Sequence, residues 1–335
     1  MDVSELGEFG LIARLEELLA AQAADELAGR LAVGIGDDAA VWKADGYAAL
    51  ATTDTLVAGI HLLPEKTPWR DAGWKALAVN VSDIAAMGGT PEFALVTLAL
   101  PEGTRAEDLD ELYQGLAEAC REYGVVVAGG DVVRAPTFSI TVALTGRAGL
   151  DELGEPLVLR RDGGSAGDVV AVTGALGGSA GGLRALRDGT EAPALIERHL
   201  RPRPRVDAGR AAIIAGIRCA IDVSDGLLQD LGHICRASRL GAVVWRDKLP
   251  VDEALSGAFE REEALSLAAT GGEDYELLLT GSQEQIDALA RAIDVPVTVI
   301  GELVIQPDHR PALLDENAQD VTPADAGWDH LRKRG

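Results

Sequence analysis

Residues 69–89 read WRDAGWKALAVNVSDIAAMGG, and they predict a long helix over residues 69–87 that ends at Gly88 and Gly89. From residue 76 to 87 the run is apolar on nearly every face, so we expect this helix inside the protein. Asn80 and Asp83 interrupt it on one shared face. An ordinary surface position would require both to reach solvent from a helix that has almost no polar side. We therefore interpret Asp83 as a functional residue.

The segments around this helix predict a first domain rich in strands. The expected strands are residues 31–41, 47–57, 93–100, 125–133 and 138–145, and a second helix is expected at 105–123. An amphipathic helix over residues 11–19 precedes them. Residues 150–167 are rich in glycine, proline and charge without periodicity, which is typical of a domain boundary. We predict two domains, residues 1–149 and 150–335.

Strands and helices alternate in the second half of the chain. The expected strands are residues 168–173, 219–223, 242–245, 276–280 and 297–300. The expected helices are residues 182–187, 205–214, 227–238 and 283–293. Alternation of this kind indicates an α/β domain. Residues 201–205, RPRPR, predict a stiff surface linker into a helix, with an anion site as the less favoured alternative.

Composition excludes several classes of protein. The formal net charge of −24 over 335 residues disfavours binding to nucleic acid or to an anionic membrane. No apolar run approaches the ~20 residues that span a bilayer, and the first residues do not resemble a signal peptide. We expect a soluble, cytoplasmic protein. The three cysteines have no metal-binding spacing and predict buried, reduced thiols.

Acidic residues recur at the ends of apolar runs. Asp37 and Asp38 stand between two such runs, and although Gly-Asp-Asp is also a turn sequence, adjacent acids repel each other unless a cation lies between them. Thr52, Thr53 and Asp54 offer hydroxyl and carboxylate oxygens on consecutive residues. Oxygen ligands are what Mg²⁺ prefers. The pattern predicts a site for hard cations, and such sites commonly hold phosphates.

Two later motifs predict contacts to anions. Gly129, Gly130 and Asp131 follow an apolar run, and glycines there allow the backbone to approach a phosphate, although a tight β-turn explains them equally well. The sequence IDVSDGL, residues 221–227, places Asp222, Ser224 and Asp225 between a strand and a helix. Anions gather at such helix starts, whereas helix capping would explain only one of the three.

The glycine-rich residues 174–182, GALGGSAGG, also lie between a strand and a helix. They lack the spacing of a dinucleotide-binding loop, and no lysine in the chain follows a glycine, which excludes a Walker loop. We predict a turn. If ATP binds, metal ions and arginine must supply the countercharge. Of the five histidines only His61 follows an acidic motif closely; His199 and the others predict ordinary surface or helix positions.

Eight collinear segments together resemble the bacterial thiamine-monophosphate kinase family, within the aminoimidazole ribonucleotide synthetase-like (PurM-like) superfamily of ATP-binding proteins. They are GEFGLIARL, GIGDDAAV, TTDTLVAGIHL, KALAVNVSDIAAMGG, GGDVVR, HLRPRPR, AIDVSDGLLQDLGHI and GGEDYELLLTG. The resemblance implies an α/β (α+β) fold in two domains. The N-terminal sheet domain would pair across a homodimer, and the C-terminal α/β domain would complete the ATP and substrate site. The apolar residues 93–100 and 138–145 suit strands that are covered on both faces.

The resemblance also implies the reaction. ATP would phosphorylate thiamine monophosphate to thiamine diphosphate by direct in-line transfer, with several Mg²⁺ ions between the substrates and no phosphorylated enzyme. It implies no catalytic group separate from the metal and ATP sites. The implied metal ligands are Asp38, Thr52, Thr53, Asp54, Asp83, Asp131, Asp222 and Asp225. The implied ATP contacts are Tyr113, Gly130, Asp131, Arg161 and Ser224, and the implied substrate contacts are His61, Glu273 and Trp328. Trp328 suits stacking on the pyrimidine, with simple C-terminal packing as the alternative. The resemblance leaves open whether Asp37 also coordinates a metal ion.

Other functions are compatible with the same acids. A related synthetase, of the aminoimidazole ribonucleotide or selenophosphate type, is the nearest enzymatic alternative. Selenophosphate synthetases generally use a reactive cysteine near the N-terminus, whereas the first cysteine here is Cys120. A non-catalytic sensor of nucleotides or divalent cations would keep the acids but release no ADP in response to thiamine monophosphate.

Overall fold

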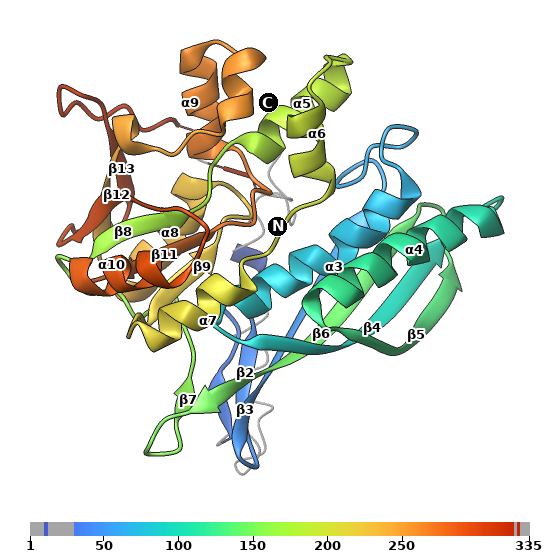
Figure 1. Cartoon of the computed structure of the whole chain (residues 1–335), viewed down its shortest axis with the longest axis horizontal. Coiled ribbons are helices and arrows are strands. Elements are labelled where there is room, and N and C mark those ends of the chain that lie inside the picture. The colour runs from blue at the N-terminus through green and yellow to red at the C-terminus, as the bar shows by residue number, and fades with distance from the viewer. Residues whose placement is uncertain (1–9, 13–29, 325–326, 329–335) are drawn as a thin grey trace.

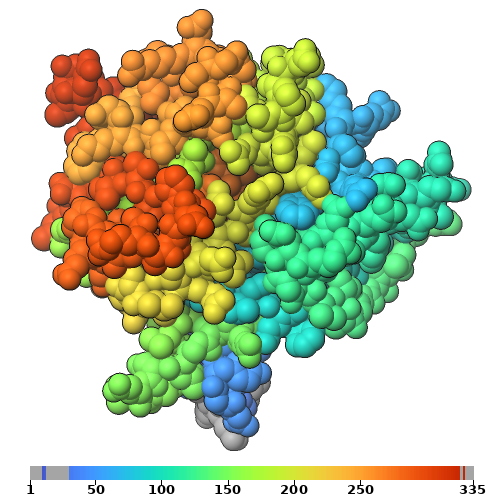
Figure 2. All heavy atoms as spheres, in the orientation of Figure 1, coloured from blue at the N-terminus to red at the C-terminus, as the bar shows by residue number. Residues whose placement is uncertain are grey.

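The computed structural model describes residues 10–12, 30–324 and 327–328, and it contains two β-sheets with helices on them (Figure 1). The predicted helix at 11–19 lies almost wholly outside the described residues. The first half of the chain builds one sheet and the second half the other, and the two halves pack directly against each other (Figure 2). Within the part of the chain that the structure describes, no helix is long and apolar enough to cross a membrane.

The first sheet has seven strands in the order β1-β2-β3-β6-β4-β5, with β7 paired to β6. They are β1 (Leu31–Val33), β2 (Ala40–Ala44), β3 (Tyr47–Val57), β4 (Thr90–Leu100), β5 (Val126–Arg134), β6 (Ser139–Leu150) and β7 (Pro156–Leu157). The expected single strand over residues 31–41 is wrong. Gly36, at φ 112°, breaks it between β1 and β2 and leaves Asp37 and Asp38 in a bend.

The predicted helix at 69–87 is confirmed as α3 (Trp69–Ala86). It packs on β3 and β6 on one side and on α7 and β9 of the second half on the other, which explains its apolar sequence. Helix α4 (Ala106–Tyr123) lies beside it. Glycines let the two helices touch, since a Cβ on Gly73 would lie 1.8 Å from the Leu112 carbonyl oxygen and one on Gly115 would lie 1.7 Å from that of Arg70.

The second sheet has six strands in the order β13-β10-β12-β8-β11-β9, and only the pair β10 and β13 is parallel. The strands are β8 (Val169–Thr173), β9 (Cys219–Asp222), β10 (Gly241–Trp245), β11 (Leu277–Gly281), β12 (Val297–Val304) and β13 (Pro311–Leu314). The helices are α5 (Gly178–Asp188), α6 (Pro193–Leu200), α7 (Val206–Ile214), α8 (Leu227–Ser238), α9 (Arg261–Thr270) and α10 (Gln283–Ala292). The sequence did not predict α6, α9 or β13.

The segment at residues 201–205 joins the two halves and is not a surface linker as predicted. Arg201 lies over the Trp74 ring at 4.5 Å and pairs with Glu118 of α4. Trp74 Nε1 donates a hydrogen bond to the Pro202 carbonyl at 2.9 Å. Arg205 forms a two-point ion pair with Glu276 beside β11. These contacts tie α3 and α4 to the second sheet.

The first sheet has one uncovered face in the single chain. Helices α3 and α4 cover one side of it (Figure 1). On β4, however, Phe93 and Leu95 are 53% and 54% exposed, and Val126 and Val133 on the edge strand β5, which pair with Phe93 and Ala99, are 56% and 44% exposed. The expected double cover is therefore not provided by the described residues of this chain.

The cysteines are free thiols. Cys219 and Cys235 are buried as predicted, whereas Cys120 is only half-buried.

Candidate functional site

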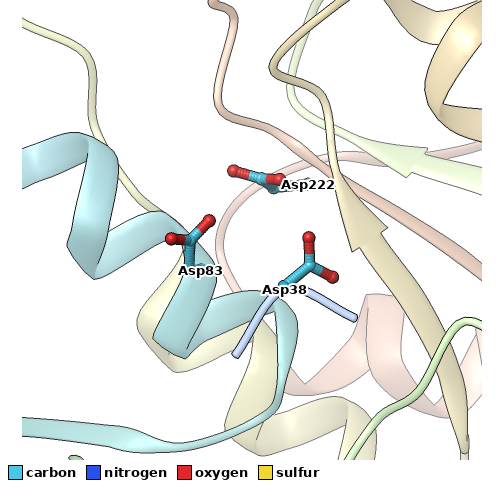
Figure 3. A group of neighbouring side chains, drawn as sticks. All are labelled: Asp38, Asp83 and Asp222. Atoms are coloured by element: carbon cyan, nitrogen blue, oxygen red, sulfur yellow. The ribbon is translucent and has the colours of Figure 1, made fainter. Parts of the chain in front are cut away.

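Three aspartates from distant parts of the chain converge between the two sheets (Figure 3). Asp38 lies in the bend before β2, Asp83 on α3 and Asp222 at the end of β9. One carboxylate oxygen from each lies within 4.8 Å of the others. We call these three residues the acidic cluster. The sequence predicted all three as metal ligands, and the structure brings them together.

Each carboxylate of the acidic cluster has one partner that fixes its orientation. Thr52 Oγ1 donates to Asp83 at 2.5 Å and Ser82 Oγ donates to Asp222 at 2.5 Å. Arg161 Nη2 donates to Asp38 Oδ1 at 2.7 Å. The other oxygen of Asp38, Oδ2, is buried and accepts no hydrogen bond from the residues that the structure describes. The cluster thus holds ordered acceptors, one of which has no donor.

Burial and mutual repulsion shift the acids of this region. Burial first, then the neighbouring Asp54, raises the pKa of Asp83 well above its usual value. Burial first, then Asp38, raises the pKa of Asp222 to about 8. A cation bound among these oxygens would remove the repulsion. The atoms that could bind a metal ion are all carboxylate oxygens, and one of them, Asp38 Oδ2, accepts no hydrogen bond from the described residues. The cluster therefore fits a hard divalent cation such as Mg²⁺.

Asp37 stands beside the cluster but has other partners. Its oxygens accept hydrogen bonds from the backbone N–H groups of Asp38 at 3.0 Å and Arg161 at 3.2 Å. Burial, and then the charge of Asp38, raises its pKa to about 7. Its carboxylate therefore shapes the bend that presents Asp38.

Strand β3 distributes its three predicted ligands over two faces. Thr52 points to the acidic cluster, and Asp54, two residues on, lies on the same face and contributes to the pKa shift of Asp83. Thr53 lies on the other face, where its hydroxyl donates to the Val142 carbonyl at 3.2 Å. Side chains alternate along a strand, so consecutive residues cannot all reach one site.

The loop after β9 is held by a carboxylate that the sequence analysis missed. Asp230 Oδ2 accepts the backbone N–H groups of Ser224, Asp225 and Gly226 at 3.0, 3.1 and 3.0 Å. Asp225 in turn accepts from Gln229 Nε2 at 3.0 Å, and the Trp328 N–H donates to the Asp225 carbonyl at 3.1 Å. Trp328 thus lies at this loop. The only sequence signal for Asp230 was its position in the first turn of a helix.

A second group of polar side chains surrounds Glu273. Lys75 Nζ lies 2.7 Å from Glu273 Oε1 and His199 Nδ1 lies 3.4 Å from Oε2. Although burial opposes it, the Lys75 ammonium lowers the pKa of Glu273. His61 Nδ1 accepts the Val57 N–H at 3.1 Å.

His199 itself is buried, and burial, then Lys75, lowers its pKa to about 3, so the ring is neutral. The sequence predicted neither Lys75 nor His199 here, because only the tertiary contact with Glu273 identifies them.

Three predicted ATP or metal contacts lie away from the acidic cluster in this chain. Gly130 and Asp131 are within strand β5, so the alternative of a tight turn is wrong. A Cβ on Gly130 would lie 1.8 Å from the Val96 carbonyl oxygen, which explains the glycine. Asp131 is three strands from β3 across the sheet, roughly 14 Å at ordinary strand spacing.

Tyr113 is the third predicted contact that lies away from the acidic cluster. It lies on α4 beside the first turn of α3, at the end of α3 opposite Asp83, where it lines a surface pocket with Arg70 and Glu118.

The glycine-rich residues 174–182 were predicted to form a turn, but only residues 174–177 bend the chain, and residues 178–182 already belong to α5. The Asp274 carboxylate accepts the N–H groups of Gly177 at 2.7 Å and Ser179 at 3.0 Å, at the start of α5. Burial raises the pKa of Asp274 to about 7. A side-chain carboxyl therefore already occupies these donors, which a phosphate would otherwise use.

Comparison with known proteins identifies similar chains. The family models for the N-terminal and C-terminal domains of AIR synthase related proteins match residues 36–148 and 165–312. The thiamine-monophosphate kinase of Escherichia coli (strain K12) is 39% identical, over 97% of this chain and 98% of its own.

Solved structures of thiamine-monophosphate kinases are also similar to this chain. AaThiL in complex with AMPPCP and TMP matches with a TM-score of 0.84 and 32% identity, covering 98% of this chain and 99% of that one. The thiamine-monophosphate kinase of Stenotrophomonas maltophilia K279a matches with a TM-score of 0.74 and 36% identity, covering 89% and 95%.

Proposed function

This chain belongs to the thiamine-monophosphate kinase family, and we propose that its acidic cluster is where ATP phosphorylates thiamine monophosphate, giving thiamine diphosphate and ADP. The observation that carries the assignment to this site is the convergence of Asp38, Asp83 and Asp222 from both halves of the chain. A site assembled from both sheets can hold two phosphate compounds between them.

The residues suggest how the reaction proceeds. Asp38, Asp83 and Asp222, with Asp54, would hold Mg²⁺ directly or through water, and Thr52 fixes the Asp83 carboxylate. Bound Mg²⁺ would offset the repulsion between the two phosphate compounds and stabilise the charge of the in-line transition state. Arg161, already beside Asp38, would supply a cation next to the phosphates. The second pKa of a phosphate monoester is near ~6, so the attacking oxygen of thiamine monophosphate needs no separate base.

The other implied contacts remain part of the same proposal. Ser224 would contact ATP and Asp225 a metal ion, on the loop that Asp230 orders. His61, Glu273 and Trp328 would contact thiamine monophosphate. Thr53, Tyr113, Gly130 and Asp131 do not meet the acidic cluster within one chain. Their assignment therefore depends on backbone contacts or on a second copy of the chain.

One assay tests the reaction. ADP release is measured with ATP and with or without thiamine monophosphate, in Mg²⁺ and in EDTA. We expect release only when thiamine monophosphate and Mg²⁺ are both present. ATP and Mg²⁺ binding without such release would indicate the sensor, and release driven by an aminoimidazole ribonucleotide precursor or by selenide would indicate a related synthetase.

The stability gained from Mg²⁺ should increase with pH. Burial and neighbouring acids raise the pKa of Asp37 to about 7 and of Asp222 to about 8, from 3.8. A raised carboxyl pKa stabilises the folded protein when the group is protonated, and this contribution disappears as the pH rises from about 4 through about 8. Mg²⁺ needs the ionised form, so its binding competes with protons.

Thermal melts with MgCl₂ and with EDTA at about pH 6 and about pH 8.5 measure this effect. We expect a larger increase in Tm from Mg²⁺ at the higher pH, and a smaller difference in Asp222→Asn. An equal increase at both pH values would contradict the role of the cluster.

We further propose that two copies of the chain pair through the uncovered face of the first sheet. The exposed Phe93, Leu95 and Val126 form an apolar surface that a second copy would bury. Leu95→Glu should convert a dimer into a monomer by light scattering. Ile305→Glu, at a position that is 87% exposed in the other half of the chain, is the matched control and should stay dimeric. A wild-type monomer would contradict this proposal.

A further inference from the structure

A buried lysine lies on the Glu273 side of the site. Lys75, on α3, is 1% exposed, and its Nζ is 2.7 Å from Glu273 Oε1. Within the described residues this is the one ion pair that Lys75 forms, and its Nζ has no hydrogen bond of good geometry. A buried ammonium with a single partner contributes little net stability, because its desolvation offsets the attraction. A purely stabilising role therefore does not account for it.

Glu273 is held from several directions. His199 Nδ1 lies 3.4 Å from Oε2, and Ser179 Oγ lies 3.0 Å from the same nitrogen. The Glu273 N–H donates to the Ser224 carbonyl at 2.8 Å, and its backbone has a φ of 68°. That left-handed conformation is unfavourable for glutamate, so the surrounding contacts must impose it. The backbone of Glu273 is thus held in place, and its carboxylate is oriented by Lys75 and His199.

The held carboxylate can still receive a ligand. Its side chain is 23% exposed, and the nearby Lys75 ammonium lowers its pKa despite burial, so it is ionised. An ionised carboxylate only accepts hydrogen bonds, and those it accepts are stronger than bonds between neutral groups. The ring end of thiamine monophosphate carries an amino group on its pyrimidine, which is a donor of the matching kind.

Resting on the proposed function, we propose that Lys75 is a positioning residue for the ring end of the substrate. It orients Glu273 so that the carboxylate accepts a hydrogen bond from the amino group of the aminopyrimidine. Lys75 does not itself touch the substrate or the phosphates. Its effect should therefore appear in the binding of thiamine monophosphate and not in that of ATP.

Lys75→Met tests this role, because methionine keeps most of the side-chain length and removes the charge. We expect KM for thiamine monophosphate to rise roughly 10- to 100-fold, the range for losing a hydrogen bond to a charged group. We expect kcat and KM for ATP to change by less than about threefold, because the lost interaction forms before the transition state. Lys66→Met is the matched control: Lys66 also reaches the second half of the chain, at the Leu186 and Arg187 carbonyls, but is exposed. It should leave all three constants unchanged.

A double variant separates positioning from general damage. If Lys75 acts through Glu273, then Lys75→Met in a Glu273→Gln background should raise KM no further than Glu273→Gln alone. This comparison also serves if Lys75→Met alone does not fold, since the double variant buries no unpaired charge. A further increase of about tenfold in the double variant, or a fall in kcat with unchanged KM, would overturn the proposal. Wild-type protein without ADP release that depends on thiamine monophosphate would instead overturn the proposed function, and this inference with it.

Discussion

Asp83→Asn is expected to lower kcat by roughly 10²- to 10³-fold or more, while the protein remains folded. Asparagine has the same shape and can still accept the hydrogen bond from Thr52. It removes one of the three charges of the acidic cluster, which with Asp54 would hold Mg²⁺. Because Asp54 and Asp222 repel the Asp83 carboxylate, the metal-free variant should have an equal or higher Tm than the wild type.

Steady-state kinetics measure the expected fall in kcat, and thermal melts in EDTA measure the expected Tm. Asp71→Asn is the control, since Asp71 lies on the same helix but pairs with Arg201, 3.3 Å away. It should keep its turnover and have a lower Tm. A kcat near the wild-type value in Asp83→Asn would contradict the assignment of the acidic cluster.

Arg205→Met is expected to lower the free energy of unfolding by about 3–5 kcal/mol. Arg205 Nε donates to Glu276 Oε2 at 2.6 Å, and its Nη2 donates to Oε1. The Glu276 side chain is only 6% exposed, so loss of the arginine leaves a buried, unpaired charge. The contact also joins residues 201–205 to the second sheet, so its loss should weaken the packing between the two halves of the chain.

Urea unfolding measures this change. Arg203→Met is the matched control in the same segment, because Arg203 is 69% exposed and 3.9 Å from Glu197. Exposed pairs of this kind contribute about 0–1 kcal/mol. Similar losses in both variants would show that the Arg205 pair is not a principal contact between the halves. Arg205→Met with Glu276→Gln should recover part of the stability.

Local pattern predicted the elements of this fold better than their pairing. The helix at 69–87 could be predicted because residues 76–87 form one long, almost entirely apolar run. The strand at 31–41 was not divided correctly, since apolar residues stand on both sides of Gly36, Asp37 and Asp38, and the bend at these residues depends on tertiary contacts such as the one with Arg161. Short helices such as α9, with the sequence REEALSLAAT, show little amphipathic pattern. The pairing of β3 with β6 joins residues about ninety positions apart, which no local periodicity encodes.

Site residues could be predicted where a polar residue interrupts an apolar segment. Asp83 is conspicuous because it interrupts an apolar helix, and the structure places it among other acids. Thr53 was grouped with Thr52 by adjacency, although strand alternation separates them. Lys75 has no local signal, because its importance comes from Glu273, which only the folded chain brings near. Asp230 has only its place in the first turn of a helix, and its three backbone N–H partners could not be predicted from that.

Helix α3 carries both Lys75 and Asp83, and it packs on β3 and β6 of the first sheet and on α7 and β9 of the second half. The eight helical steps from Lys75 to Asp83 correspond to about 12 Å of rigid helix at 1.5 Å per residue. One element therefore sets the distance between the end of the site that would hold the pyrimidine and the end that would hold the phosphates. The site should select substrates by length, so that analogues with a shorter or longer link between ring and phosphate engage only one end.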